Sequence, residues 1–272
     1  MKTLPFIKMH GLGNDYVYLD GFSPETAALL AQTDFPDLAR RLSDRHFGIG
    51  SDGLVLILPD EKADAYMRMF NADGSEAQMC GNAIRCVAKY LYESGRCKRK
   101  RMQIETLSGI HTLDLQLAGD TVEQVTVNVG KPRITQDLLF LNNKPLPFVS
   151  VNIGNPHAVF FRDALPTEDF PALGERIGTD AHFPEGTNVE FVRIRNAQEI
   201  DLRVWERGTG ETLACGTGAC AAAVAAMWLG KAQHTITVHL RGGDLSVRWD
   251  NNDAPVYMTG PATEVFRGEF NL

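Results

Sequence analysis

The chain has 272 residues, and 27 basic against 34 acidic side chains leave a formal net charge of −7 at pH 7. This length suits one large domain or two small ones, each able to bury a core. The negative charge argues against nucleic-acid and anionic-membrane partners, because both would repel it. Lys8 and His10 interrupt the N-terminus before a signal-peptide apolar stretch develops, and no segment has the apolar length of a membrane span, so we expect a cytoplasmic protein.

The first half of the chain is rich in short apolar or alternating segments, which predict strands. In chain order we expect a strand at 16–19, short helices at 24–32 and 36–46, strands at 54–57 and 65–70, a helix at 83–93 and a strand at 122–129. The helix at 83–93 carries Ile84, Val87 and Leu91 at helical spacing, and Gly95 can end it. The basic run at 98–101 is interpreted as a solvated turn after this helix.

The stretch 131–147 contains three prolines and Asn142-Asn143, and we interpret it as the crossing between two halves. Beyond it we expect strands at 146–153, 158–161, 189–194, 200–205, 236–240 and 245–249, and an alanine-rich helix at 219–229. Many strands around one central helix, twice over, predict an α+β protein. The expected domains are 1–118, possibly joined by 262–272, and 119–261.

The chain also repeats itself. An offset of 135 residues carries Cys80-Gly81-Asn82 onto Cys215-Gly216-Thr217 and residues 67–71 onto 202–206 without a gap. At an offset of 136, Asp52 falls on Asn188. Several matches in the same order indicate the duplication of one unit, with a period that is too long for a solenoid and fits two small domains.

Two of the five cysteines occupy equivalent places in this repeat. In both halves a glycine-containing loop leads through Cys80 or Cys215 into a helix, so each cysteine is expected at a helix N-terminus. Free N–H groups and the positive end of the helix dipole favour anions there. We therefore expect the thiol pKa to fall below its usual value of about 8.5, and the N–H groups to hold a substrate carboxylate.

This arrangement suits an enzyme that inverts a carbon next to a carboxylate. A thiolate removes the α-proton on one face while a thiol returns a proton on the other, and donors aimed at the carboxylate stabilise the charge that develops. Cys86, Cys97 and Cys220 are interpreted as packing residues. The odd cysteine count argues against a disulfide framework, and no histidine stands at zinc-ligand spacing, so we expect neither a metal nor a cofactor.

At these residues the sequence resembles the diaminopimelate epimerase family, pyridoxal-independent enzymes of lysine and cell-wall precursor synthesis. The resemblance runs almost end to end, through motifs at 8–15, 70–75, 79–82, 105–106, 154–157, 186–189, 206–212 and 214–218. It implies two barrel-like domains, each around its central helix, an active site in the inter-domain cleft, and a homodimer. Cys80 and Cys215 would be the catalytic pair.

The resemblance also implies the remaining site residues. Gly81-Asn82 and Gly216-Thr217 would present N–H groups to the carboxylate at the reacting carbon, and His157 and Glu206 would tune the thiols. The polar groups of the substrate, including its distal amino-acid head, would be bound by Asn14, Asn71, Asn155, Asn188, Glu206 and Arg207. Arg207 is suited to clamp a carboxylate and Glu206 to accept an ammonium group.

Three alternatives stay open. A proline or hydroxyproline racemase or epimerase would use the same two bases, but it would leave Arg207 and the asparagines without a second head to bind. A non-catalytic amino-acid-binding protein would not need reactive thiols. A pyridoxal enzyme would need a lysine beside a phosphate-binding loop, and neither Lys89 nor Lys231 has one.

Overall fold

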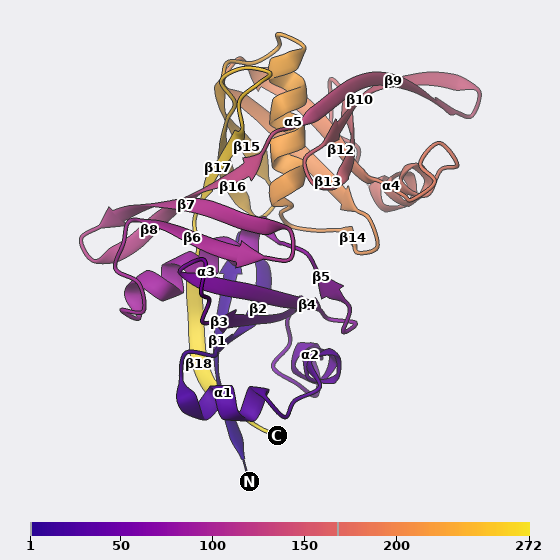
Figure 1. The fold of residues 1–272 in the computed structure, drawn as a ribbon. Helices are drawn as coiled ribbons and strands as arrows, with labels where there is room; N and C mark the ends of the chain where they lie inside the picture. The colour runs from indigo at the N-terminus through magenta and orange to yellow at the C-terminus, as the bar shows by residue number, and fades with distance from the viewer. Residues whose placement is uncertain (1, 168) are drawn as a thin grey trace. The chain divides into compact units, whose positions relative to one another are not determined.

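A computed structural model describes residues 2–167 and 169–272, and its chain divides into two compact units (Figure 1). Unit 1 contains the residues up to Val127 together with Gly260–Leu272, and unit 2 contains Asn128–Thr259. Each unit is an α+β arrangement, as the sequence predicted.

Unit 1 is built from strands packed around one buried helix, with two shorter helices on the outside of the sheet. Its elements are β1 (Thr3–Gly11), β2 (Asn14–Asp20), α1 (Pro24–Leu30), α2 (Phe35–Ser43), β3 (Gly53–Leu58), β4 (Ala65–Asn71), β5 (Glu76–Ala77), α3 (Gly81–Glu93), β6 (Arg101–Thr106), β7 (Gly109–Ala118), β8 (Thr121–Gly130) and β18 (Thr263–Asn271).

Unit 2 is likewise built from strands packed around one buried helix, α5, with a single further helix, α4. Its elements are β9 (Arg133–Leu141), β10 (Lys144–Asn152), β11 (Pro156–Phe161), α4 (Phe170–Gly178), β12 (Asn188–Asn196), β13 (Glu199–Glu206), β14 (Gly210–Glu211), α5 (Gly216–Trp228), β15 (Thr235–Leu240), β16 (Gly243–Arg248) and β17 (Val256–Gly260).

The strand pairings confirm that one unit is the duplicate of the other. In unit 1 the order across the sheet is β18, β1, β2, β3, β4, β6, β7 and β8, with parallel pairs at β2–β3 and β4–β6. In unit 2 it is β9, β10, β11, β12, β13, β15, β16 and β17, with parallel pairs at β11–β12 and β13–β15. The strand at each position therefore has the same direction and the same neighbours.

The central helix of each unit is buried on nearly all sides because the sheet surrounds it. Every residue of α3 except Glu93 is buried, and so is every residue of α5 except Thr217 and Trp228. Helix α5 is also apolar almost all round, as is typical of a core helix, whereas α3 buries Arg85 and Lys89 as well. Both helices begin directly after the cysteines, at Gly81 and Gly216, two and three residues before the starts that we expected.

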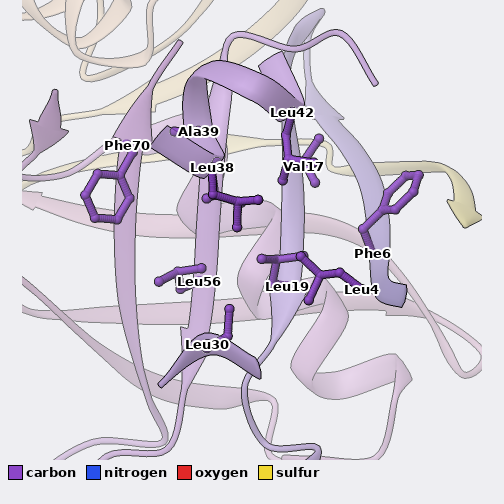
Figure 2. Close-up of a cluster of buried hydrophobic side chains, with 11 residues drawn as sticks. Leu4, Phe6, Val17, Leu19, Leu30, Leu38, Ala39, Leu42, Leu56 and Phe70 are labelled. Carbon is purple, nitrogen blue, oxygen red and sulfur yellow. The ribbon is translucent and has the colours of Figure 1, made fainter. Parts of the chain in front are cut away.

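The strands of unit 1 carry a second apolar face that packs against α1 and α2 (Figure 2). Leu4 and Phe6 from β1, Val17 and Leu19 from β2, and Leu38 and Leu42 from α2 belong to this cluster. Because both faces of β2 and β3 are covered, these strands read in the sequence as continuous apolar runs. Helix α2 ends earlier than expected because the Asp44 carboxylate accepts from the backbone N–H groups of His46 and Phe47, both at 2.7 Å, and turns the chain.

The C-terminal strand β18 lies alongside β1 (Figure 1), where it takes the place that β9 takes in unit 2. The boundary that we expected at 118/119 falls in the turn joining β7 and β8, whereas unit 1 extends to Val127. The difference arises because β8 pairs with β7 from Thr121 to Val127 and so remains part of the sheet of unit 1.

The segment 131–147 is not the simple crossing that we interpreted it to be, because it forms most of the β9–β10 hairpin. Asn142 and Asn143 adopt positive φ values of 52° and 59°, which suit a two-residue turn matched to the twist of the strands. Pro145 and Pro147 are two residues apart, so their missing donors fall on one edge of β10, along a stretch that pairs with β9 but not with β11. The prolines and asparagines therefore mark a hairpin.

Candidate active site

Cys80 and Cys215 are the N-cap residues of α3 and α5, as the sequence predicted. Both have extended backbone conformations, with φ/ψ of −135°/122° at Cys80 and −115°/114° at Cys215. The N–H groups of the first helical turn have no partner within the helix. Gly81-Asn82 and Gly216-Thr217 lie in these first turns.

Around Cys80 the structure assembles a group that we call the Cys80 cluster: Asn14, Asp52, Cys80, Asn82 and Arg85. The Cys80 thiol donates to Oδ1 of Asn14 at 3.4 Å, and Nδ2 of Asn82 donates to the same oxygen at 3.2 Å. Nδ2 of Asn14 donates to Asp52 at 2.9 Å, which fixes the orientation of its amide. Asn14 and Asn82 therefore lie beside the cysteine, as the resemblance implied.

Arg85 holds Asn82 of this cluster in place, and it was not among the predicted site residues. Its side chain is fully buried and donates to the carbonyls of Pro261 and Gly81 at 3.1 and 3.0 Å, and to Oδ1 of Asn82 at 3.0 Å. The last bond turns Nδ2 of Asn82 toward Asn14. A charged residue between the apolar Ile84 and Val87 of the predicted helix was the sequence signal for this role.

Asn71 lies at the end of β4, opposite Gly53. Its side chain donates to the Ser75 hydroxyl at 3.0 Å, and its backbone N–H donates to the Ser75 carbonyl at 2.8 Å. These bonds form a tight turn, so the contacts of Asn71 are those of a turn residue. Its predicted part in substrate binding stays a prediction.

A second group, the Cys215 cluster, consists of Asn155, His157, Glu190, Cys215 and Thr217. The Thr217 hydroxyl lies 3.6 Å from the Cys215 sulfur and accepts from Nδ2 of Asn155 at 3.3 Å. Nε2 of His157 pairs with Oδ1 of Asn155 at 2.9 Å, and Nδ1 pairs with Glu190 at 2.7 Å. Asn155, His157 and Thr217 were predicted, whereas Glu190 was missed.

Asn188, Glu206 and Arg207 lie close together in the same unit. Nδ2 of Asn188 donates to the Pro156 carbonyl at 2.8 Å, while its Oδ1 accepts from the backbone N–H of Arg207 at 2.9 Å. The Arg207 guanidinium is exposed and donates to the Glu185 carbonyl at 2.9 Å. Glu206 accepts from the Thr212 hydroxyl at 2.5 Å. Asn188 thus fixes the backbone at Arg207. The partly exposed carboxylate of Glu206 and the exposed guanidinium of Arg207 belong to neighbouring residues.

The predicted lowering of the thiol pKa is wrong for Cys215. Burial raises the pKa of Cys215 well above its usual value, and the nearby carboxyls of Glu206 and Glu190 raise it further. Hydrogen bonds from Thr217 and from the Gly218 N–H, which is 3.4 Å from the sulfur, oppose this rise but do not cancel it. The resemblance implied the influence of Glu206, whereas the burial of the thiol and the carboxyl of Glu190, which lies on β12, were not predicted.

The other cysteines have different surroundings. Cys86 and Cys220 are fully buried in the central helices, and burial raises the pKa of Cys86 to about 11. All five cysteines are free thiols.

Over residues 2–167 and 169–272, no group of three or more His, Cys, Asp or Glu side chains is arranged to hold a metal ion. No helix in these ranges is both long and apolar enough to cross a membrane.

The duplicated fold is shared with solved structures of several activities. A hydroxyproline epimerase from Agrobacterium vitis is similar with a TM-score of 0.73 at 15% identity, covering 98% of this chain and 92% of that one. A phenazine biosynthesis protein from Bacillus anthracis is similar with a TM-score of 0.69 at 17% identity, covering both chains fully. The fold thus defines a class of proteins made of two duplicated α+β units, each around a central helix.

Within this class, sequence similarity identifies the family. The family model described as diaminopimelate epimerase matches residues 6–135 and 149–265. Diaminopimelate epimerases from Desulfitobacterium hafniense and Pelotomaculum thermopropionicum are 46% and 47% identical, covering 97% of this chain and 97% and 98% of theirs. One from Methanococcus maripaludis is 46% identical and covers 99% of this chain and 100% of its own. The chain belongs to the diaminopimelate epimerase family.

Proposed function

We propose that this protein interconverts LL- and meso-diaminopimelate without a cofactor, as an isomerase of lysine and cell-wall precursor biosynthesis. The observation that carries the proposal is the pair of cysteines at equivalent helix N-caps, in a chain of this family. A two-base epimerase needs one such group for each face of the carbon that it inverts.

In the proposed reaction the thiolate of one cysteine takes the α-proton and becomes a thiol. The electron pair of the broken C–H bond moves into the carboxylate, where the N–H groups at Gly81-Asn82 and Gly216-Thr217 stabilise it. The thiol of the other cysteine then gives its proton to the opposite face of the carbon and becomes the thiolate. The raised pKa of Cys215 supports its entering the reaction as the thiol, with Cys80 as the base.

The polar groups of the substrate, including its distal amino-acid head, are proposed to be bound by Asn14, Asn71, Asn155, Asn188, Glu206 and Arg207. The exposed guanidinium of Arg207 and the carboxylate of Glu206 are adjacent in the chain, and they suit the carboxylate and ammonium groups of that head. A site built for such groups rejects substrates that lack them, because its own polar groups would then stay unpaired. His157 is proposed to act on the thiol through Asn155 and Thr217.

A cytoplasmic location and a homodimeric assembly are proposed as well. The odd number of free cysteines supports a reducing compartment, and the dimer follows from the family resemblance. Gel filtration with light scattering distinguishes a dimer of about 60 kDa from a monomer of 30.0 kDa.

The direct test supplies LL-diaminopimelate to the purified protein without any added cofactor and follows the appearance of the meso isomer. Proline and 4-hydroxyproline serve as comparison substrates, because they have a reacting carbon but no second amino-acid head. Conversion of diaminopimelate alone supports the proposal. Turnover of proline or hydroxyproline without turnover of diaminopimelate refutes it.

A further inference from the structure

Glu190 is a buried charge with apolar neighbours on both sides in strand β12. Its neighbours Val189 and Phe191 face the hydrophobic cluster under α4, and because side chains alternate along a strand, Glu190 faces the opposite way, toward α5. The side chain is fully buried. Burying a carboxyl group is costly unless the group is paired, so packing alone does not account for Glu190.

Only one oxygen of this carboxyl is hydrogen-bonded. Oε1 lies 2.7 Å from Nδ1 of His157, whereas Oε2 is buried with no hydrogen-bond partner among the residues that the structure describes. Nε2 of His157 faces the carbonyl oxygen of the Asn155 amide at 2.9 Å and therefore carries a proton. One further proton lies between Nδ1 and Oε1. With that proton on Nδ1, the pair is an imidazolium and a carboxylate.

The carboxylate end of this pair is turned toward Cys215. A Cβ atom placed on Gly218 would lie 2.9 Å from Oε1 of Glu190 and 3.3 Å from the sulfur of Cys215. The first turn of α5 is therefore all that separates the two groups, and glycine at 218 is what lets them approach. Glu206, on β13, is the second carboxyl that acts on the thiol, and the His157 ring is bonded to Glu190.

The Cys80 cluster has no counterpart of this carboxyl. The strand registers place Val55 where unit 2 has Glu190, and the repeat places Ala83 where unit 2 has Gly218. Unit 1 instead buries Arg85 at the position of Cys220, and the acid of its cluster, Asp52, is linked to Cys80 through Asn14. The two cysteines share a backbone arrangement but have different charged groups around them.

We propose that Glu190 is a positioning residue for the reaction: its buried carboxylate, held by His157, keeps the Cys215 thiol protonated so that Cys215 starts as the proton donor. The role in the reaction rests on the proposed function, but the effect on the thiol does not. A negative charge separated from the sulfur by one turn of buried helix opposes formation of a second negative charge there.

The test measures the alkylation of each cysteine by iodoacetamide across pH, in the full-length protein, with peptide mass spectrometry. In Glu190→Gln, which keeps the size and a hydrogen bond to His157, the midpoint of Cys215 alkylation shifts to lower pH and its rate at pH 8 rises at least about fivefold. Glu190→Met removes the charge and the hydrogen bond together and shifts the midpoint in the same direction. Cys80 is the internal reference and keeps its midpoint.

Asp201→Asn is the matched control, because Asp201 is a buried acid on the adjacent strand β13 whose carboxylate is bound by Arg193. It leaves the Cys215 midpoint unchanged. A faster rate at high pH with no shift of midpoint would reflect greater exposure of the sulfur, and would overturn the proposal, as would an unchanged midpoint in Glu190→Gln.

The reaction itself gives a second readout. In Glu190→Gln the kcat for diaminopimelate falls about tenfold or more while KM changes less than about threefold, because the thiol and not the substrate head is affected. If the wild type does not turn over diaminopimelate, the proposed function fails. The alkylation midpoint still decides whether Glu190 controls Cys215.

Discussion

The side-chain oxygen of Asn14 lies 3.4 Å from the sulfur of Cys80 and accepts its S–H. Asn14 begins β2 and Cys80 caps α3, so the contact joins the start of a strand to the start of the central helix. In unit 2 the corresponding asparagine, Asn155, reaches its cysteine only through Thr217. A single duplicated backbone thus holds two thiols in different polar surroundings.

Asp52 holds the side-chain amide of Asn14 in place, and removing the Asp52 carboxylate leaves that amide without this hydrogen bond. Oδ2 of Asp52 accepts from Nδ2 of Asn14 at 2.9 Å and from the backbone N–H of Asp15 at 3.0 Å. Asp52→Ala is expected to raise KM for diaminopimelate about tenfold. Asp52→Asn is expected to stay within about threefold of wild type, because an amide oxygen still accepts and unit 2 has Asn188 at this position. Steady-state kinetics check both variants, and equal defects would contradict this account.

Arg85 is expected to be essential for the stability of unit 1. Arg85→Met leaves two carbonyls and the Asn82 amide oxygen without their donor, and hydrogen bonds from charged groups are worth about 1.5–3 kcal/mol each. We expect the free energy of unfolding to fall by about 3 kcal/mol or more, measured by urea denaturation. The control Arg267→Met loses an exposed ion pair with Glu264 and should cost less than about 1 kcal/mol.

Gly218 is expected to resist replacement by alanine, although alanine normally stabilises a helix by about 1 kcal/mol. The added methyl group would lie 2.9 Å from Glu190 and 3.3 Å from the Cys215 sulfur, so one of them must move. Gly218→Ala should therefore lower kcat at least about tenfold and bring no gain in Tm. Ala83→Gly, the reverse change at the equivalent position, should lower stability by about 1 kcal/mol and leave Cys80 alkylation unchanged. A more stable, fully active Gly218→Ala would count against the close packing around the sulfur.

Cys86 should make the protein less stable in alkali. Burial raises its pKa from 9.0 to about 11, so the folded chain keeps the proton while the unfolded chain loses it. The unfolded state then binds fewer protons, and the free energy of unfolding falls by roughly 2–3 kcal/mol as the pH rises from about 9 to about 11.

Cys86→Val removes this contribution, so its stability should decline less steeply than wild type over that range. The two curves are compared in a Tyr18→Phe background, because Tyr18 also has a raised pKa and interacts with Cys86, so its own titration would change with the substitution. Parallel curves would show that Cys86 does not titrate in this way.

The sequence predicted the duplication, both central helices and the cysteines at their N-caps, because these depend on local patterns: apolar spacing, glycine loops and repeated motifs. It did not predict β1, in which Lys8 interrupts the apolar pattern. That lysine is buried and paired with Asp15, a residue of the next strand. Local patterns cannot show a compensation that is supplied by another element.

The same limit applies to the candidate site. Asn14, Asn155, His157 and Thr217 were predicted from motifs, and Asp52 was visible as the repeat partner of Asn188 but was not selected. Glu190 could have been noticed as a charge between Val189 and Phe191 in the predicted strand 189–194. Its effect on Cys215 could not, because that effect depends on the approach of β12 to the first turn of α5.

The central claim is that Cys80 and Cys215 exchange protons with opposite faces of one carbon. Incubation of LL-diaminopimelate in deuterated water, followed by mass spectrometry of early product, tests it most directly. The account predicts one solvent deuterium at the inverted carbon for the wild type, and at least a hundredfold loss of epimerisation in each of Cys80→Ala and Cys215→Ala. Wild-type epimerisation in either variant, or product that retains the original hydrogen, would contradict it.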